Sequence, residues 1–147
     1  MNAQDGTTVH ASCVVLGEAG VLIRGPSGSG KSQLARRLVS AYPGFARLVS
    51  DDRVRIEVRH GRLVARSVPA IAGTLEIRGL GLMQAAFEPA AVVRLVVDAL
   101  PGPADRLPDE ADARAYVCGV ALPRIAGRLD SLVEATLWRL NPSMTGL

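Results

Sequence analysis

The chain has 147 residues, which suits a single domain with its own hydrophobic core. Apolar residues make up 48% of it but aromatic residues only 3%, so the core must consist of Val, Leu, Ile and Ala. The net charge is +3, yet no basic run interleaved with aromatic residues occurs, which argues against nucleic-acid binding. With no signal peptide and no apolar run of membrane-spanning length, we expect a cytoplasmic protein without membrane contact. Cys13 and Cys118 belong to no metal-binding pattern and are expected to be buried free thiols.

The first half of the chain alternates strand and helix patterns. Apolar runs flank glycine-containing turns, which predicts hairpins, and Leu34, Ala35, Leu38 and Val39 share one helical face. Tyr42-Pro43-Gly44 is expected to end that helix. The predicted elements are a hairpin at 14–16 and 21–23, a helix at 31–41, a strand at 47–50, and a second hairpin at 54–58 and 63–65.

The patterns in the second half of the chain define its helices and strands less clearly. It contains an extended stretch at 75–81, a turn or short helix at 83–87, a buried strand at 92–97, a loop at 101–113, a strand at 115–120 and an amphipathic helix at 130–140. No repeat or linker divides the chain, so residues 1–147 are expected to form one catalytic domain with loose termini at 1–8 and 141–147.

The segment GPSGSGKS follows the first hairpin and precedes the first helix, and it fits the phosphate-binding pattern GxxxxGK[ST]. Glycines let backbone N–H groups approach phosphate oxygens, and the N-terminus of a helix attracts anions. The only lysine of the chain would neutralise phosphate charge, and the hydroxyl that follows it would bind Mg²⁺. We therefore predict an α/β P-loop nucleotide-binding domain with a mostly parallel sheet and β-hairpin extensions, binding ATP and Mg²⁺ through Gly25, Pro26, Ser27, Gly28, Ser29, Gly30, Lys31 and Ser32.

Two adjacent acidic residues, Asp51 and Asp52, come directly after the strand predicted at 47–50. In a parallel sheet the carboxyl end of a strand faces the nucleotide. One carboxylate there could hold Mg²⁺ through water, and the other could accept the proton of an attacking hydroxyl. Adjacent residues at a strand end point to different sides, so the pair predicts two separate roles.

Three segments, HASCVVLGEAGVLIRGPSGSGKS, LVSDDRV and LEIRGLGL, resemble the catalytic C-terminal domain of HPr kinase/phosphorylase. The resemblance spans roughly residues 9–100 and is to the short alphaproteobacterial form without the N-terminal domain. It implies an ATP-dependent kinase that phosphorylates a serine of HPr, the phosphocarrier of the sugar phosphotransferase system, and so regulates carbon and nitrogen metabolism. A homo-oligomer is expected as well.

The resemblance also implies roles for single residues. His10 would orient the catalytic aspartate, Asp51 would be the base for the serine hydroxyl, Ser32 and Glu76 would bind Mg²⁺, Arg106 would stabilise the transferring phosphoryl group, and Asp52 and Arg78 would lie nearby. The family's C-terminal PVRPGR run, which is linked to dephosphorylation of phosphoserine, is matched poorly by residues 122–128. The reverse reaction is therefore left open.

Two alternatives remain from the sequence. The chain could phosphorylate a hydroxyl of another protein or of a small molecule, and a deep polar acceptor pocket would favour a small molecule. It could instead be a non-catalytic ATP-sensing module, which would need the glycine-rich segment but no base beside it.

Overall fold

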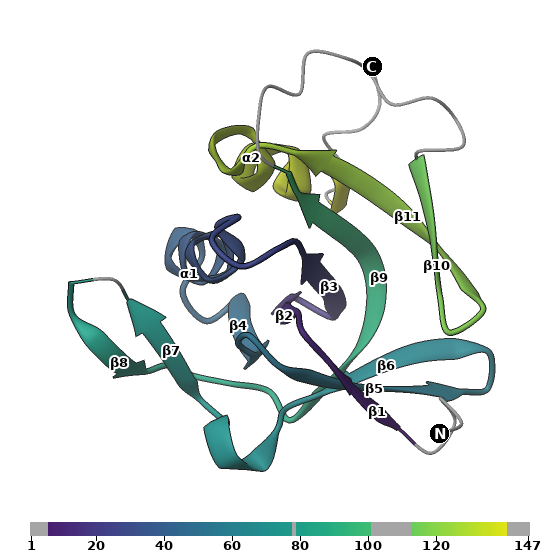
Figure 1. The fold of residues 1–147 in the computed structure, drawn as a ribbon, viewed down its shortest axis with the longest axis horizontal. Coiled ribbons are helices and arrows are strands. Elements are labelled where there is room, and N and C mark those ends of the chain that lie inside the picture. The colour runs from purple at the N-terminus through teal and green to yellow at the C-terminus, as the bar shows by residue number, and fades with distance from the viewer. Residues whose placement is uncertain (1–5, 78, 101–112, 141–147) are drawn as a thin grey trace.

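The computed structural model describes residues 6–77, 79–100 and 113–140 (Figure 1). Their elements form a nine-stranded sheet, a separate two-stranded sheet and two α-helices. In chain order they are β1 (Thr7–Val9), β2 (Ser12–Leu16), β3 (Ala19–Arg24), α1 (Lys31–Ala41), β4 (Ala46–Ser50), β5 (Val54–Arg59), β6 (Arg62–Arg66), the 3₁₀ turn η2 (Pro69–Ile71), β7 (Thr74–Ile77), β8 (Gly81–Gln84), β9 (Ala90–Ala99), β10 (Arg114–Val117), β11 (Val120–Gly127) and α2 (Leu129–Leu140). Neither described helix is long and apolar enough to cross a membrane.

The large sheet is mixed and mostly antiparallel, so the prediction of a mostly parallel sheet is wrong. Its strands follow the order β1-β5-β6-β9-β3-β2-β4, and β11 pairs with β9 and β10 outside that order. Among the described strands, only β3–β9 and β9–β11 pair in parallel. The reason is local, because β2–β3, β5–β6 and β10–β11 are hairpins and tight turns force antiparallel neighbours.

Four strands nevertheless end at one edge of the sheet, which we call the carboxyl edge. β2 is antiparallel to both β3 and β4, so β3 and β4 run in the same direction. β9 and β11 share that direction because they pair in parallel with β3 and with each other. The glycine-rich segment after β3 and the aspartates after β4 therefore lie at the same edge, together with the beginning of β2.

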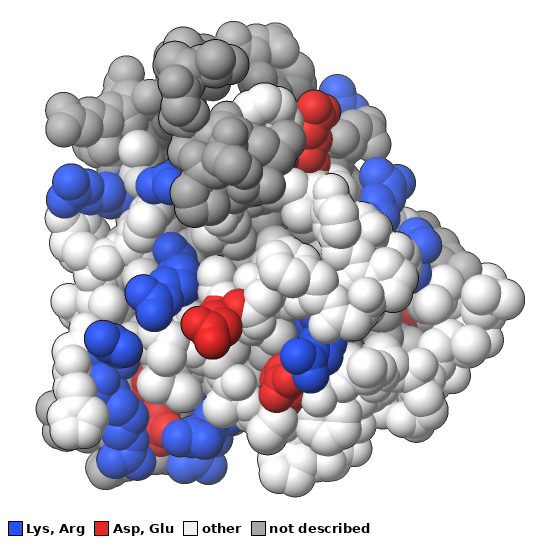
Figure 2. Space-filling model, turned by 180° about the vertical axis from the view of Figure 1, so that it is seen from behind, with Lys and Arg blue, Asp and Glu red and all other residues white. Residues whose placement is uncertain are grey.

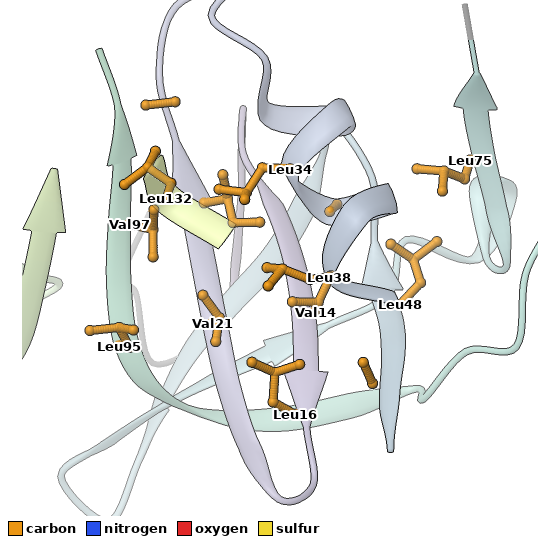
Figure 3. Close-up of a cluster of buried hydrophobic side chains, with 14 residues drawn as sticks. Val14, Leu16, Val21, Leu34, Leu38, Leu48, Leu75, Leu95, Val97 and Leu132 are labelled. Atoms are coloured by element: carbon orange, nitrogen blue, oxygen red, sulfur yellow. The ribbon is translucent and has the colours of Figure 1, made fainter. Parts of the chain in front are cut away.

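The core has one layer on each face of the sheet. On one face the apolar sides of α1 and α2 pack against alternate residues of β2, β3 and β9, among them Val14, Val21 and Leu95 (Figure 3). On the other face the β5–β6 and β10–β11 hairpins cover residues such as Val15 and Leu22. Each fully buried aliphatic side chain of this kind stabilises the fold by about 1.5–3 kcal/mol.

Most local predictions in the first half are confirmed, and the errors fall mainly in the second half. Both predicted hairpins, the first helix and the strand before the aspartates are present. The expected turn or helix at 83–87 is wrong, because residues from 81 to 84 form β8 and pair with β7. The single strand expected at 115–120 is a hairpin, because Cys118 and Gly119 both have positive φ (51° and 80°), as type I′ turns require.

The two cysteines, the N-terminus and the loop at 101–113 were also the subject of predictions. Cys13 is buried as expected, but Cys118 is exposed in its turn. The N-terminal residues expected to be loose include Thr7 and Thr8, which pair with β5 as part of β1. The loop expected at 101–113 lies outside the described residues, except for its last position.

Candidate active site

The glycine-rich loop connects β3 to α1 at the carboxyl edge. Gly25 packs so closely that a Cβ atom there would lie 2.7 Å from the carbonyl oxygen of Ala99 and 2.5 Å from Ser29 Oγ. Gly30 precedes the first residue of α1 with φ at 100°, and its carbonyl accepts the Leu34 N–H at 2.8 Å. Larger residues cannot adopt this path without strain, so the loop is a backbone surface that leads into a helix N-terminus.

Lys31 lies at the centre of this loop. Only 5% of the residue is exposed, and its Nζ donates to the carbonyl oxygens of Gly25 at 2.8 Å and Pro26 at 3.3 Å. The ammonium group is thereby held among the loop carbonyls at the first turn of α1. A positive charge in this position complements an anion placed over the loop amides.

Asp51 connects three elements behind the loop. Its Oδ1 accepts hydrogen bonds from Ser32 Oγ and from Ser12 Oγ, each at 2.8 Å, and only 7% of the residue is exposed. The end of β4 is thus joined to the start of α1 and to the start of β2. Ser12 was not predicted as a site residue, although a hydroxyl that begins the otherwise apolar run at 13–16, two positions after His10, was a usable signal.

Asp52 faces the opposite way. Its carboxylate Oδ1 lies 2.6 Å from His10 Nε2, and the two side chains are 60% and 50% exposed. Its backbone N–H donates to Ser12 Oγ at 3.0 Å, and its φ of 66° is left-handed, a region that Asp tolerates better than most residues. The histidine was expected to orient Asp51, but it contacts Asp52 instead.

A cavity of about 630 Å³ lies between the glycine-rich loop and the β7–β8 hairpin and opens to solvent. It is lined by Ser27, Gly28, Gly30, Lys31, Ser32, Gln33, Asp52, Glu76, Ile77, Gly79 and Gly81. The fold therefore brings Lys31, Ser32, Asp52 and Glu76 to one cavity, with Asp51 behind Ser32 and His10 beside Asp52. Arg78 and Arg106 lie outside the described residues.

The oxygen donors of this cavity suit Mg²⁺. A hydroxyl and two carboxylates, from Ser32, Asp52 and Glu76, line it. No group of three or more His, Cys, Asp or Glu side chains placed to hold a metal exists among the described residues. Mg²⁺ usually keeps several waters and binds through one or two protein groups plus phosphate oxygens.

A partly buried ion network lies next to the start of the loop. Arg24, the residue before the loop, donates two hydrogen bonds to the Asp98 carboxylate at 2.7 and 2.8 Å, and Arg124 donates a third at 2.5 Å. Burial alone would raise the pKa of Asp98, but the bonds from the two arginines outweigh it and hold that pKa below its usual value. The network joins the carboxyl ends of β3 and β9 to β11, so it braces the start of the loop.

The family model described as HPr Serine kinase C-terminal domain matches residues 2–94. The chain belongs to this family. Among relatives of the HPr serine kinase family, the HPr kinase/phosphorylase of Chromobacterium violaceum is 33% identical over 150 residues, which cover 89% of this chain and 46% of that protein. The HPr kinase/phosphorylase of Clostridium beijerinckii is 42% identical over 77 residues, or 52% of this chain and 24% of that protein. The chain thus spans less than half the length of these relatives.

A solved structure of the HPr(Ser) kinase/phosphatase from Coxiella burnetii has the same fold. It superimposes with a TM-score of 0.76 and covers 95% of this chain and 99% of that one, at 24% sequence identity. The match confirms an α/β domain of the HPr kinase type. The family resemblance inferred from the three sequence segments is confirmed as well.

Proposed function

We propose that the chain transfers the γ-phosphoryl group of ATP to a serine hydroxyl of an HPr-like phosphocarrier protein, in the cytoplasm and as a homo-oligomer. One observation carries the proposal: Lys31 and Ser32 of the glycine-rich loop share a cavity with the carboxylate of Asp52. The names of the relatives support HPr as the acceptor. Loop, lysine and carboxylate are the parts that phosphoryl transfer requires.

In this proposal the loop binds the phosphates of ATP. Its backbone N–H groups and the N-terminus of α1 stabilise negative charge, and Lys31 adds a point charge close to the β and γ phosphates. Ser32 and Glu76 would hold Mg²⁺, which supplies charge neutralisation on the phosphates when bound. Asp51 orients the Ser32 hydroxyl through their 2.8 Å hydrogen bond.

We assign the general base to Asp52, although the family resemblance implied Asp51. The Asp51 carboxylate is buried and already accepts two hydroxyl hydrogen bonds on one oxygen. The Asp52 carboxylate lines the open cavity, and His10 holds it from one side. A base must reach the proton it removes, and accessibility favours Asp52.

The proposed reaction is an in-line displacement. Asp52 accepts the proton of the serine hydroxyl while the serine oxygen forms a bond to the γ-phosphorus, and the bond between that phosphorus and the bridging oxygen breaks. ADP leaves with the bonding electron pair. Arg106 and Arg78 remain candidates for stabilising the phosphoryl charge, because both were implied by the family resemblance.

Two features favour a protein acceptor over the alternatives. The cavity opens to solvent, so an acceptor hydroxyl on a protein surface can reach it, whereas a small-molecule kinase would be expected to enclose its acceptor. A purely ATP-sensing module would have no use for an exposed carboxylate that is oriented by a histidine.

The test is a transfer assay with purified chain, MgATP and an HPr-like phosphocarrier, followed by intact-mass and peptide mass spectrometry. We expect one phosphate on a single serine, none when that serine is replaced by Ala, and a much slower transfer when Lys31→Ala is used. Tight ATP binding without phosphorylated carrier would refute the kinase. A second arm with phosphoserine carrier and inorganic phosphate tests the reverse reaction, and light scattering tests the oligomer.

A further inference from the structure

One solvent-facing side of the antiparallel half of the sheet is dominated by arginine. Along β5, β6 and β9 the inward residues, such as Ile56, Leu63 and Val93, are buried in the core, and the residues between them point outward. We call the outward set the arginine face; its charged members are Arg55, Arg59, Arg62, Arg66, Arg94 and the acidic Glu57, and Val64, Ala90 and Val92 lie between them. In Figure 2 basic side chains gather where the β5–β6 hairpin lies, around an acidic one.

The arrangement places like charges directly opposite each other. Arg55 pairs with Arg66 across the two strands, and Arg59 pairs with Arg62. Glu57 offsets part of this repulsion, but five arginines against one glutamate give the face more excess positive charge than the +3 of the whole chain. A concentrated positive charge indicates a surface suited to an anionic partner.

Glu57 orients part of this surface. Its side chain is only 5% exposed, accepts a hydrogen bond from Arg66 Nε and lies 3.3 Å from Arg59 Nη2. The hydrogen bond from Arg66 lowers the pKa of Glu57, so the carboxylate stays ionised. Two guanidinium groups are therefore held in fixed directions, which reduces the entropy lost when they bind carboxylates.

The arginine face begins close to the candidate active site, with Arg55 three residues after Asp52. Asp52 lines the cavity, and β5 begins two residues later at Val54 and runs away from it. A protein whose hydroxyl enters the cavity would extend over β5 and β6. No aromatic side chain lies among the outward residues of these strands, which leaves the face without stacking platforms for bases or anchors for a bilayer.

We propose that the arginine face is the docking surface for the protein substrate, and that this substrate presents acidic side chains beside its acceptor serine. The inference rests on the proposed function, because the substrate is the acceptor of the phosphoryl group. Arginine forks pair with carboxylates in two-point geometry, which fixes the orientation of the substrate as well as attracting it.

The experiment compares two double variants of equal charge change in the transfer assay. Arg62→Glu with Arg94→Glu alters the arginine face, and Arg114→Glu with Arg139→Glu alters exposed sites on β10 and α2. We expect the first variant to raise KM for the carrier about tenfold or more at low salt, with kcat and the KM for ATP within twofold of wild type. The increase should shrink as salt rises, and the control variant should change KM less than twofold.

A single neutral substitution distinguishes an effect on substrate docking from an effect on protein stability. Replacing Arg62 by Gln removes one like-charge pair, so the unfolding midpoint should stay the same or rise while KM for the carrier still increases. A fall in stability that accounts for the change in KM would overturn the docking role. Equal kcat/KM values for the face variant and the control variant would also overturn it.

The two proposals fail differently. If wild type transfers no phosphate, the proposed function fails, and direct binding of labelled carrier by fluorescence anisotropy then decides the docking surface. Binding to wild type but not to the Arg62→Glu, Arg94→Glu variant supports docking, and absence of binding to wild type overturns it. If that variant loses binding to duplex DNA or to phosphatidylserine vesicles while carrier kinetics are unchanged, the face serves that ligand and the docking proposal is wrong.

Discussion

Replacing Asp52 by Asn tests the assignment of the general base. The amide keeps the size of the side chain and can still hydrogen-bond His10, but it cannot accept a proton from the serine. Since the Asp52 and His10 side chains are 60% and 50% exposed, their ion pair contributes about 1 kcal/mol or less to stability, and the variant should fold normally. Loss of a general base slows transfer by about 10²–10⁴-fold, which corresponds to about 2.7–5.4 kcal/mol of barrier.

The assay is single-turnover transfer to the carrier, combined with equilibrium binding of MgATP. Asp52→Asn should lose at least about 100-fold in rate while the Kd for MgATP stays within threefold. Asp51→Asn is the matched comparison: it weakens two buried hydrogen bonds to Ser12 and Ser32, so stability should fall by about 1–3 kcal/mol and MgATP should bind more weakly. A fully active Asp52→Asn, beside an Asp51→Asn that binds MgATP normally but transfers nothing, would refute the assignment.

Three further predictions follow from other parts of the molecule. Lys31→Ala should lower MgATP affinity and turnover together, each by about 100-fold, and unchanged affinity by calorimetry would contradict its role. Burial raises the pKa of the Cys13 thiol to about 12, whereas Cys118 is exposed. Iodoacetamide at pH 8 should therefore modify Cys118 first and Cys13 only in denaturant. Equal labelling rates of the two thiols in the folded protein would contradict the burial of Cys13. Asp98→Asn should cost about 1–3 kcal/mol at neutral pH, because Arg24 and Arg124 then lose their charged hydrogen-bond acceptor at this position. The pKa of Asp98 is lowered in the folded state, so the difference in unfolding free energy between wild type and variant should be complete above about pH 5 and shrink as pH falls through the folded pKa. Urea melts that show a constant difference down to pH 3 would contradict this expectation.

Local patterns predicted the elements better than their pairing. The alternation of Val54 and Ile56 with charged residues predicted a hairpin, because it depends only on which side chains point inward. Which strands lie beside β9 depends instead on contacts between distant segments, and no local pattern encodes them. The β10–β11 turn uses Cys118-Gly119 rather than the usual Asn-Gly or Asp-Gly, so it gave no turn signal.

The candidate site was predictable as a set of residues but not as a set of contacts. The GPSGSGKS pattern, the aspartate pair and Glu76 led to residues that do meet around one cavity or directly behind it. The sequence predicted that the two aspartates point to different sides, but not that Asp51 contacts two serines while Asp52 contacts His10, because these contacts join separate segments of the chain. The brace under the loop joins Arg24 to Asp98 across 74 positions, a separation at which a single sequence carries no signal.

The ten-residue strand β9 belongs to both layers of the core, so both halves of the molecule depend on it. It pairs with β6 at its beginning and with β3 and β11 toward its end, and its side chains alternate between the helix-covered layer, through Leu95 and Val97, and the hairpin-covered layer, through Val93 and Val96. Neither layer can therefore lose its packing while the other keeps its own. Denaturant should melt the domain in one cooperative step, with circular dichroism and Trp138 fluorescence reporting the same midpoint.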